Sequence, residues 1–223
     1  MFLKVGHRGA KAYEPENTLR SFKKALELGA NAIEIDARLT KDENLVCMHD
    51  EKLEKTTNGT GLVSEHTLNE IKKLDAGKGE KVPTLEEALK FIDEKAKVLI
   101  DLRSDEAAEQ VLKFIQKLKL VNNIILISSK SEILKHIKKL EPKIETGMWY
   151  VKHPNPLETA LEIKLSYLKP IWFSCHSDII KKSHENGIKV LTWVVNEKSK
   201  AQEFVKKGID GIVTDKPDIL KDL

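Results

Sequence analysis

The chain has 223 residues, with 38 Lys or Arg against 35 Asp or Glu, which gives a formal net charge of +3. About 40% of the residues are hydrophobic, enough for one sizeable core and too many for a disordered chain. The nearly balanced charge argues against nucleic acid as a partner, and the length favours a single domain over residues 1–223.

Short runs of β-branched and apolar residues alternate with amphipathic stretches of helical length. The runs that predict strands are Leu3–His7, Asn31–Asp36, Leu45–His49, Lys97–Leu102, Asn123–Ser128, Glu145–Tyr150, Tyr167–Phe173, Lys189–Val195 and Gly211–Thr214. The helical patterns are Thr18–Leu28, Leu85–Glu94, Asp105–Leu118, Ser131–Leu140, Pro156–Ile163, Asp178–Asn186 and Lys198–Lys207. This repeated order predicts right-handed crossovers and a parallel sheet.

The third predicted strand breaks the alternation. Only eight residues separate Asp36 from Leu45, too few for a helical crossover between parallel strands. Lys41–Asn44 is polar, as in a turn, so we predict that Leu45–His49 returns antiparallel as the arm of a β-hairpin, with His49 roughly opposite Asp36. Eight parallel strands remain, which predicts a compact (β/α)8 TIM barrel. A doubly wound open sheet is the alternative.

A long connection follows the hairpin. Residues 50–82 are rich in Thr, Gly, Lys and Glu, and the segment is long for a loop between a strand and a helix. We expect this small insertion to lie over the barrel mouth and to cover the substrate. The alternative is a solvated loop with a helical turn around Thr67–Leu74.

The cysteine content and the lengths of the apolar runs indicate in which cellular compartment the protein is expected. Cys47 and Cys175 are too few for a disulfide framework and are not spaced as a zinc site, so we expect reduced core residues. No run approaches the roughly 18 apolar residues of a membrane span, and the start of the sequence lacks the pattern of a signal peptide. We expect a cytoplasmic monomer or homodimer without a stable membrane anchor.

Carboxylates stand near the ends of two predicted strands, where barrel enzymes carry their reacting groups. Glu34 and Asp36 are two residues apart, so both point into the barrel, while Ile33 and Ile35 face the helices. Asp101 adds a third carboxylate at the same level. Two carboxylates this close repel each other, and three oxygen donors without a nearby thiolate favour one divalent cation, Mg2+ or Ca2+, with Mn2+ as a further option.

Arginine is scarce among the 38 basic residues, at Arg8, Arg20, Arg38 and Arg103. Arg8 and Arg103 fall at predicted strand ends, and a guanidinium fork matches two oxygens of a phosphate better than lysine does. We therefore expect a phosphate to be held between these arginines and the metal. The alternative is an ion-pair cluster in which Arg8, Arg38 and Arg103 neutralise the carboxylates, and the two arrangements can coexist.

Two of the seven histidines, His7 and His49, stand at predicted strand ends beside the acidic pair. Imidazole titrates near neutral pH, so the two could share general-base and general-acid work. Independent packing in the core is the alternative. The remaining histidines fall in loops or helical stretches and are expected at the surface: His66, His136, His153, His176 and His184.

These residues belong to a longer series of motifs in one order along the chain. The sequence resembles the glycerophosphodiester phosphodiesterase family in Gly6–Gly9, Pro15–Thr18, Glu34–Asp36, His49–Asp50, Thr56–Gly59, Pro83–Glu87, Trp193–Asn196 and Gly208–Asp215. The resemblance implies a (β/α)8 barrel that hydrolyses glycerophosphodiesters, small-molecule substrates, to an alcohol and sn-glycerol 3-phosphate with a divalent metal.

The resemblance also implies roles for individual residues. His7 and His49 look like the acid–base pair, with His7 as the base, and Glu34 and Asp36 look like metal ligands. Arg8 looks like the phosphate contact, Trp193 would line the pocket, and Asn17 would support the first loop.

The sequence departs from the family pattern at the predicted strand Lys97–Leu102, because Asp101 and Arg103 stand where the family usually has Glu and Lys. This change affects the expected third metal ligand more than the expected phosphate contact. The alternatives are a phospholipase C-like or lysophospholipase D-like enzyme acting on lipids, and a non-catalytic phosphodiester-binding protein.

Overall fold

Eight parallel strands close into a barrel in the structure, a computed structural model that describes residues 1–223. In chain order they are β1 (Leu3–Gly6), β2 (Ala32–Leu39), β4 (Lys97–Leu102), β5 (Ile124–Ser128), β6 (Glu145–Tyr150), β7 (Tyr167–Pro170), β8 (Lys189–Thr192) and β9 (Gly211–Thr214). β1 pairs in parallel with both β2 and β9, which closes the ring. The (β/α)8 barrel is thus confirmed, and the open sheet is excluded.

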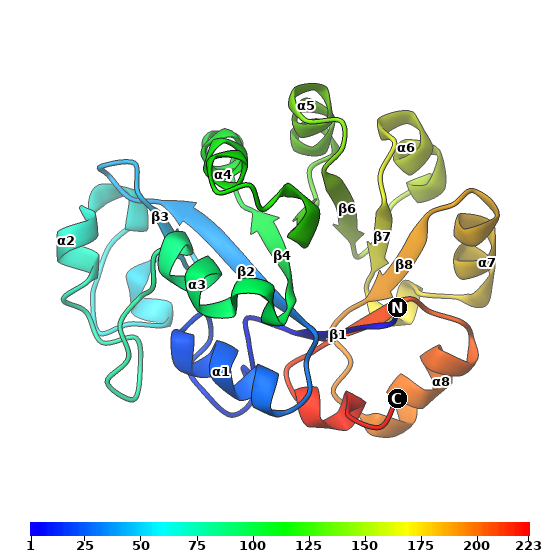
Figure 1. The fold of residues 1–223 in the computed structure, drawn as a ribbon, viewed down its shortest axis with the longest axis horizontal. Coiled ribbons are helices and arrows are strands. Elements are labelled where there is room, and N and C mark those ends of the chain that lie inside the picture. The colour runs from blue at the N-terminus through cyan, green and yellow to red at the C-terminus, as the bar shows by residue number, and fades with distance from the viewer.

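Helices surround the strands (Figure 1). They are α1 (Leu19–Glu27), α3 (Leu85–Ile92), α4 (Asp105–Lys117), α5 (Ser131–Leu140), α6 (Pro156–Ile163), α7 (Ser177–Glu185) and α8 (Lys198–Lys206). The largest apolar cluster packs α1, α3 and α4 against the outer face of β2, where Ile33 and Ile35 are fully buried as expected. Their burial fixes which face of β2 points inward.

None of the helices combines the length and the apolar character that a membrane span requires.

The barrel interior has an apolar floor. It is formed by Leu3, Val5, Ala32, Leu99, Ile125, Ile127, Tyr167, Leu191 and Val213. Because side chains alternate along a strand, the next inward positions toward the C-terminal ends continue this face. Those positions carry buried Glu34, Asp36, Asp101 and Lys169. A charged layer therefore lies directly above a dry floor.

The predicted hairpin is present. β3 (Leu45–Cys47) pairs antiparallel with the end of β2, with Ala37 opposite Cys47. The Met48 amide donates to the Asp36 carbonyl at 3.0 Å, so His49 follows one residue past the position opposite Asp36. β2 runs to Leu39, beyond its predicted end at Asp36, because pairing with β3 supplies hydrogen bonds for the extra residues.

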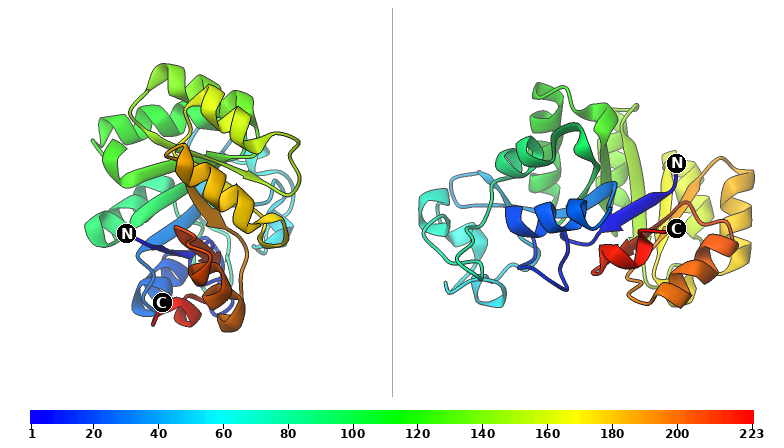
Figure 2. Two further views of the ribbon diagram at one scale, coloured as in Figure 1. Left: turned by 90° about the vertical axis from the view of Figure 1, so that its right-hand side faces the viewer. Right: turned by 60° about the horizontal axis from the view of Figure 1, so that its bottom comes forward.

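The insertion packs on β3 at the edge of the mouth (Figures 1 and 2). It contains one short helix, α2 (Leu68–Ile71), within the helical turn expected around Thr67–Leu74. Its own apolar cluster is formed with β3 by Val46, Met48, Leu53, Val63, Ile71, Ala76 and Val82. Lys78 Nζ joins it to the loop after β1, donating at 2.8 Å to the Tyr13 carbonyl and to Glu14 Oε2.

Two strands end three residues earlier than predicted. β7 stops at Pro170, not at Phe173, because the chain turns over the barrel rim and Trp172–Ser174 form a 3-10 turn. β8 stops at Thr192, not at Val195, because from Trp193 onward the chain bends toward β9, where the Val195 amide donates to the Val213 carbonyl at 3.0 Å. Cys47 and Cys175 are buried free thiols, as expected.

Candidate active site

The C-terminal ends of the barrel strands bring together the side chains that the sequence singles out. Asp36 and Asp101 lie directly opposite each other in the β2–β4 register, so their carboxylates share one level, as expected. The side chains gathered at this end of the barrel are His7, Arg8, Glu34, Asp36, His49, Asp101, Arg103 and Trp193, together with Trp149, Lys169 and Asp215, which the sequence analysis did not select.

Asp36 is the most tightly held of the carboxylates. It is 1% exposed, and Arg103 Nε and a terminal Arg103 nitrogen lie 3.1 and 2.6 Å from its Oδ1. Asn17 Nδ2 donates to Oδ2 at 2.9 Å, and Arg8 Nε lies 3.3 Å from the same oxygen. Burial by itself raises the pKa of Asp36, but the Arg103 and Arg8 charges outweigh it and hold the pKa at about 2. Asp36 is therefore an anion at neutral pH.

Asp101 receives less compensation. Arg103 directs its hydrogen bonds to Asp36, and its nearest nitrogen is 3.2 Å from Asp101 Oδ2. Trp149 Nε1 donates to Asp101 Oδ1 at 3.1 Å. Burial raises the pKa of Asp101 to about 7, and the charge of Asp36 acts in the same direction against that of Arg103. Of the two carboxylates that Arg103 contacts, Asp101 is thus the less stabilised as an anion.

Glu34 is paired with a residue that the sequence analysis missed. Lys169 Nζ donates to Glu34 Oε2 at 2.7 Å, and the two residues are 2% and 4% exposed. Trp193 Nε1 donates to the Lys169 carbonyl at 3.0 Å, which ties the two strand ends together. The signal in the sequence is a lysine two positions after Tyr167 in a strand otherwise suited to burial, so that both side chains point inward.

Arg8 is positioned by a tight loop. Its own φ is 53° and that of Gly9 is 86°. A Cβ on Gly9 would lie 2.3 Å from Ser21 Oγ, so only glycine lets the loop pack on α1. Arg8 then reaches Asp36 with Nε and donates to Glu16 Oε1 at 2.7 Å.

The ion-pair cluster contains two of the three arginines proposed for it. Arg8 and Arg103 contact the carboxylates, but Arg38 does not. Arg38 Nε donates to the His49 carbonyl at 2.8 Å, and its terminal nitrogen is 3.7 Å from Glu51. The prediction was wrong for Arg38, because this residue lies in the hairpin, opposite Val46, and its guanidinium contacts the segment that follows β3.

The two histidines have different surroundings. His7 Nδ1 lies 2.7 Å from Asp215 Oδ1, and Asn196 holds Asp215 through its Nδ2 at 2.7 Å. His49 Nδ1 lies 3.2 Å from Asp50 Oδ2. Burial lowers the pKa of His49, the Arg103 charge acts the same way, and the Asp36 charge opposes both. A carboxylate on Nδ1 orients the His7 ring and leaves Nε2 for chemistry.

The three buried carboxylates suit a hard divalent cation by their chemistry. Glu34, Asp36 and Asp101 offer oxygen donors only, from the neighbouring strands β2 and β4. In the structure each carboxylate is instead contacted by a side-chain cation, and no three His, Cys, Asp or Glu side chains converge as ligands of an ion. The donor set fits a divalent cation, and these three residues would hold it.

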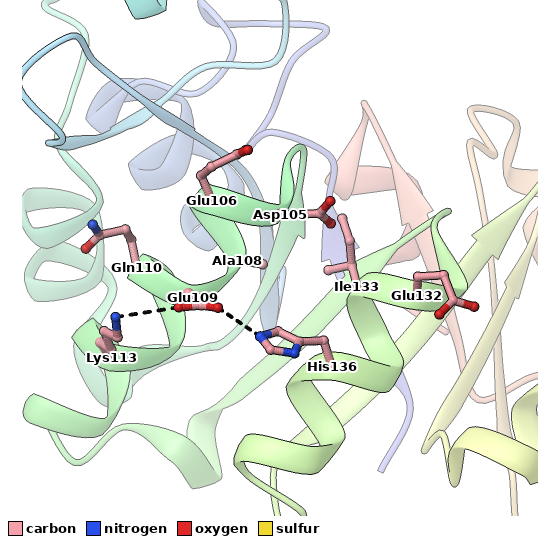
Figure 3. A pocket seen from close by; sticks show the side chains of 9 residues that line it. All are labelled: Asp105, Glu106, Ala108, Glu109, Gln110, Lys113, Glu132, Ile133 and His136. Carbon is pink, nitrogen blue, oxygen red and sulfur yellow. Dashed lines mark hydrogen bonds and ion pairs between the residues drawn. The ribbon is translucent and has the colours of Figure 1, made fainter.

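A separate hollow of about 570 Å³ lies on the outer face of the barrel between α4 and α5 (Figure 3). Three of its polar groups pair with one another: His136 Nε2 lies 2.9 Å from Glu109 Oε1, and Lys113 lies 3.6 Å from the same carboxylate. His136 is at the surface, as expected. The hollow contains none of the candidate site residues, which lie at the C-terminal ends of the barrel strands.

Comparisons with known proteins agree with this geometry. The model of the glycerophosphoryl diester phosphodiesterase family matches residues 7–219. A glycerophosphodiester phosphodiesterase of Caldanaerobacter subterraneus subsp. tengcongensis is 37% identical over 235 residues, covering 99% of this chain and 97% of the relative. The crystal structure of a glycerophosphodiester phosphodiesterase from Agrobacterium tumefaciens superposes with a TM-score of 0.91 at 29% identity, covering 100% of both chains. An Oleispira antarctica phosphodiesterase in complex with the product sn-glycerol-3-phosphate gives a TM-score of 0.90 at 26% identity, covering 98% of this chain and 94% of that one.

The His7–Asp215 pair predicts a pH-dependent loss of stability in Asp215→Asn. Burial raises the pKa of Asp215, but the hydrogen bond with His7 outweighs it and lowers the pKa overall. A carboxylate with a lowered pKa stabilises the fold above its unfolded pKa of roughly 3.9, and this contribution is lost as the pH falls below that value. We expect Asp215→Asn to lower the free energy of unfolding by about 1.5 kcal/mol at pH 7 and by clearly less at pH 3.

Urea unfolding at both pH values measures this difference. Asp222→Asn is the control, because Asp222 pairs with Lys198 at 3.1 Å on the exposed surface and should change little at either pH. Equal losses in Asp215→Asn at pH 3 and pH 7 would contradict the role of the charged pair.

Proposed function

As this chain belongs to the glycerophosphoryl diester phosphodiesterase family and is a phosphodiesterase, we propose that it cuts glycerophosphodiesters by acid–base catalysis from His7 and His49 with one divalent cation. The products are an alcohol and sn-glycerol 3-phosphate. The observation that carries this mechanism is the His7–Asp215 pair at 2.7 Å, just past the ends of β1 and β9 and beside β2, which carries Glu34 and Asp36. A protein that only bound the phosphodiester would need no oriented base.

The arginines provide the charge that a phosphate needs. Arg8 Nε is buried and makes no hydrogen bond, and Arg103 is only partly exposed at the mouth. Both guanidiniums are anchored on Asp36, so they are already in place when a substrate arrives. Fixed cations stabilise the negative charge that grows on the phosphoryl oxygens in the transition state without a cost of reorganisation.

The histidines divide the proton transfers. His7 Nε2 accepts a proton from the nucleophile, either water or the glycerol 2-hydroxyl, while Asp215 stabilises the imidazolium that forms. Attack by the hydroxyl gives a cyclic phosphate, which water then opens to sn-glycerol 3-phosphate with the proton transfers of the two rings reversed. His49 gives a proton to the leaving alkoxide. Its lowered pKa makes the protonated ring the readier donor. The proton taken at one ring is balanced by the proton given at the other.

A divalent cation bound by Glu34, Asp36 and Asp101 would supply Lewis-acid polarisation of a phosphoryl oxygen. Around it, Trp149 and Trp193 pack edge to face at 5.3 Å between ring centres and form an apolar wall. Together with the apolar floor, this wall limits the water around the arginines and carboxylates and so strengthens their electrostatic interactions.

Substitution of either histidine should abolish most activity. We expect His7→Ala and His49→Ala each to lower kcat by about 100-fold or more in the release of sn-glycerol 3-phosphate from glycerophosphocholine, because each removes one proton transfer. His184→Ala is the matched control, since His184 pairs with Asp210 at the same distance of 2.7 Å but far from the mouth, and it should keep full activity. Near-normal turnover by either variant would refute the assignment.

Removal of divalent cations tests the metal part separately. After treatment with a chelator, we expect hydrolysis of glycerophosphocholine to fall by about 100-fold or more and to return with Mg2+, Mn2+ or Ca2+, because the carboxylates then regain their ion. Asp101→Asn should need a higher concentration of the same ion for recovery. Full activity in the chelator would show that the arginines and histidines suffice without a metal.

Exposed apolar side chains favour one second candidate, an activity on lipid substrates of the lysophospholipase D or phospholipase C type. Val151, Trp172 and Phe173 are 41%, 42% and 48% exposed after β6 and β7. The Trp172 amide donates to the Trp193 carbonyl at 2.9 Å, so these side chains adjoin the proposed pocket. Our leading proposal predicts at least tenfold higher kcat/KM on glycerophosphocholine than on lysophosphatidylcholine micelles, and the reverse order would support the second candidate.

A further inference from the structure

Lys169 is the one buried lysine of the chain, with 2% of its surface exposed. A buried ammonium is costly unless it is paired, and its only salt-bridge partner is Glu34, at 2.7 Å. The ammonium also lies 5.5 Å from the centre of the Trp193 ring, where the ring face stabilises a cation. These contacts therefore fix the Lys169 ammonium in the barrel mouth, against Glu34, which is one of the proposed metal ligands.

Charge is balanced at this place by the chain itself. The buried carboxylates are Glu34, Asp36 and Asp101, and the cations in contact with them are Lys169, Arg8 and Arg103. Arg103 spans Asp36 and Asp101, whereas Lys169 contacts Glu34 alone. Glu34 and Lys169 are thus each other's only salt-bridge partners, which holds for no other pair of the cluster.

A divalent cation on Glu34 would share that carboxylate with an ammonium already bound to it. Two positive charges so close in a poorly solvated pocket repel each other, and the repulsion is far stronger than in water. Arg8 and Arg103 both contact Asp36 and are the proposed phosphate contacts, so Lys169 is the cation that can move away from its carboxylate without disturbing them. The free energy needed to break the Glu34–Lys169 pair therefore reduces the net free energy of metal binding.

We propose that Lys169 is a positioning residue that occupies Glu34 in the metal-free enzyme and competes with the divalent cation for this carboxylate. The inference rests on the proposed function, since it concerns the same metal site. It has two consequences: the chain folds with its carboxylates neutralised before any metal binds, and its affinity for the metal is lower than the three carboxylates alone would give.

The test measures binding of Ca2+ and Mg2+ by isothermal titration calorimetry to chelator-treated enzyme. Lys169→Met removes the charge at similar length, and Lys169→Gln removes it but keeps an N–H donor for Glu34, which protects the fold. Both variants should bind Ca2+ about tenfold or more tightly than the parent chain. Lys169→Arg retains the charge and should keep the affinity of the parent.

Thermal unfolding gives a second readout. Without metal, Lys169→Met should melt at a lower temperature than the parent, because Glu34 is left as an unpaired buried carboxylate. A fixed excess of Ca2+ should raise its Tm by more than it raises that of the parent. Lys97→Met is the matched control: Lys97 pairs with Glu145 between β4 and β6 at the other end of the barrel, so neither Ca2+ affinity nor the Ca2+-induced shift should change.

Equal or weaker Ca2+ binding by folded Lys169→Met and Lys169→Gln would overturn the inference while leaving the proposed function intact. If neither the parent nor any variant bound Ca2+ or Mg2+, both this inference and the metal part of the proposed function would fail. Loss of hydrolysis in the histidine variants would still stand as an independent test of the acid–base mechanism.

Discussion

Three carboxylates share the inside of one barrel mouth, and their mutual repulsion is the constraint on which the surrounding structure depends. Glu34 and Asp36 point inward because they alternate on β2, and Asp101 joins them because the register sets it beside Asp36. Anions in such a place must be neutralised or protonated. The arginines, the buried lysine, Asn17 and Trp149 all direct donors at these oxygens. In the proposed function the substrate phosphate would bring further negative charge into the same space, and cations rather than neutral donors suit that load.

The alternation of side chains along β2 separates three environments within a few residues: the outer face packed by helices, the apolar floor and the charged layer. Ile33 and Ile35 hold the helices on the outside of β2, while Ala32 belongs to the floor and Glu34 to the charged layer above it. The buried carboxylates and Lys169 thus project from hydrogen-bonded strands, and the barrel fixes their spacing, whereas His7, Arg8 and His49 lie in the loops that follow the strands. The floor below admits little water, so ion pairs in the layer above are stronger than the same pairs at the surface.

Much of this arrangement could be predicted from the sequence, because it is local. The period of two on β2, the short connection that forces a hairpin, and the position of Asp101 on the next barrel strand require only spacing. The partners could not be predicted. Lys169 meets Glu34, and His7 meets Asp215, only after closure of the barrel. The end of β7 at Pro170 and the contact of Arg38 with the His49 carbonyl depend on the path of the loops at the barrel rim. The residue pattern of a single strand carries no information about that path.

The His7–Asp215 contact joins the first strand of the barrel to the residue that follows the last one, 208 positions apart. A chain emerging from the ribosome contains His7, the arginines and the carboxylates long before it contains Asp215, which orients the His7 ring. Such a chain cannot make a competent centre until β9 has closed against β1. If His7 acts as the base that we propose, hydrolysis begins only with a finished barrel, and the appearance of activity during refolding would mark the closure of the ring.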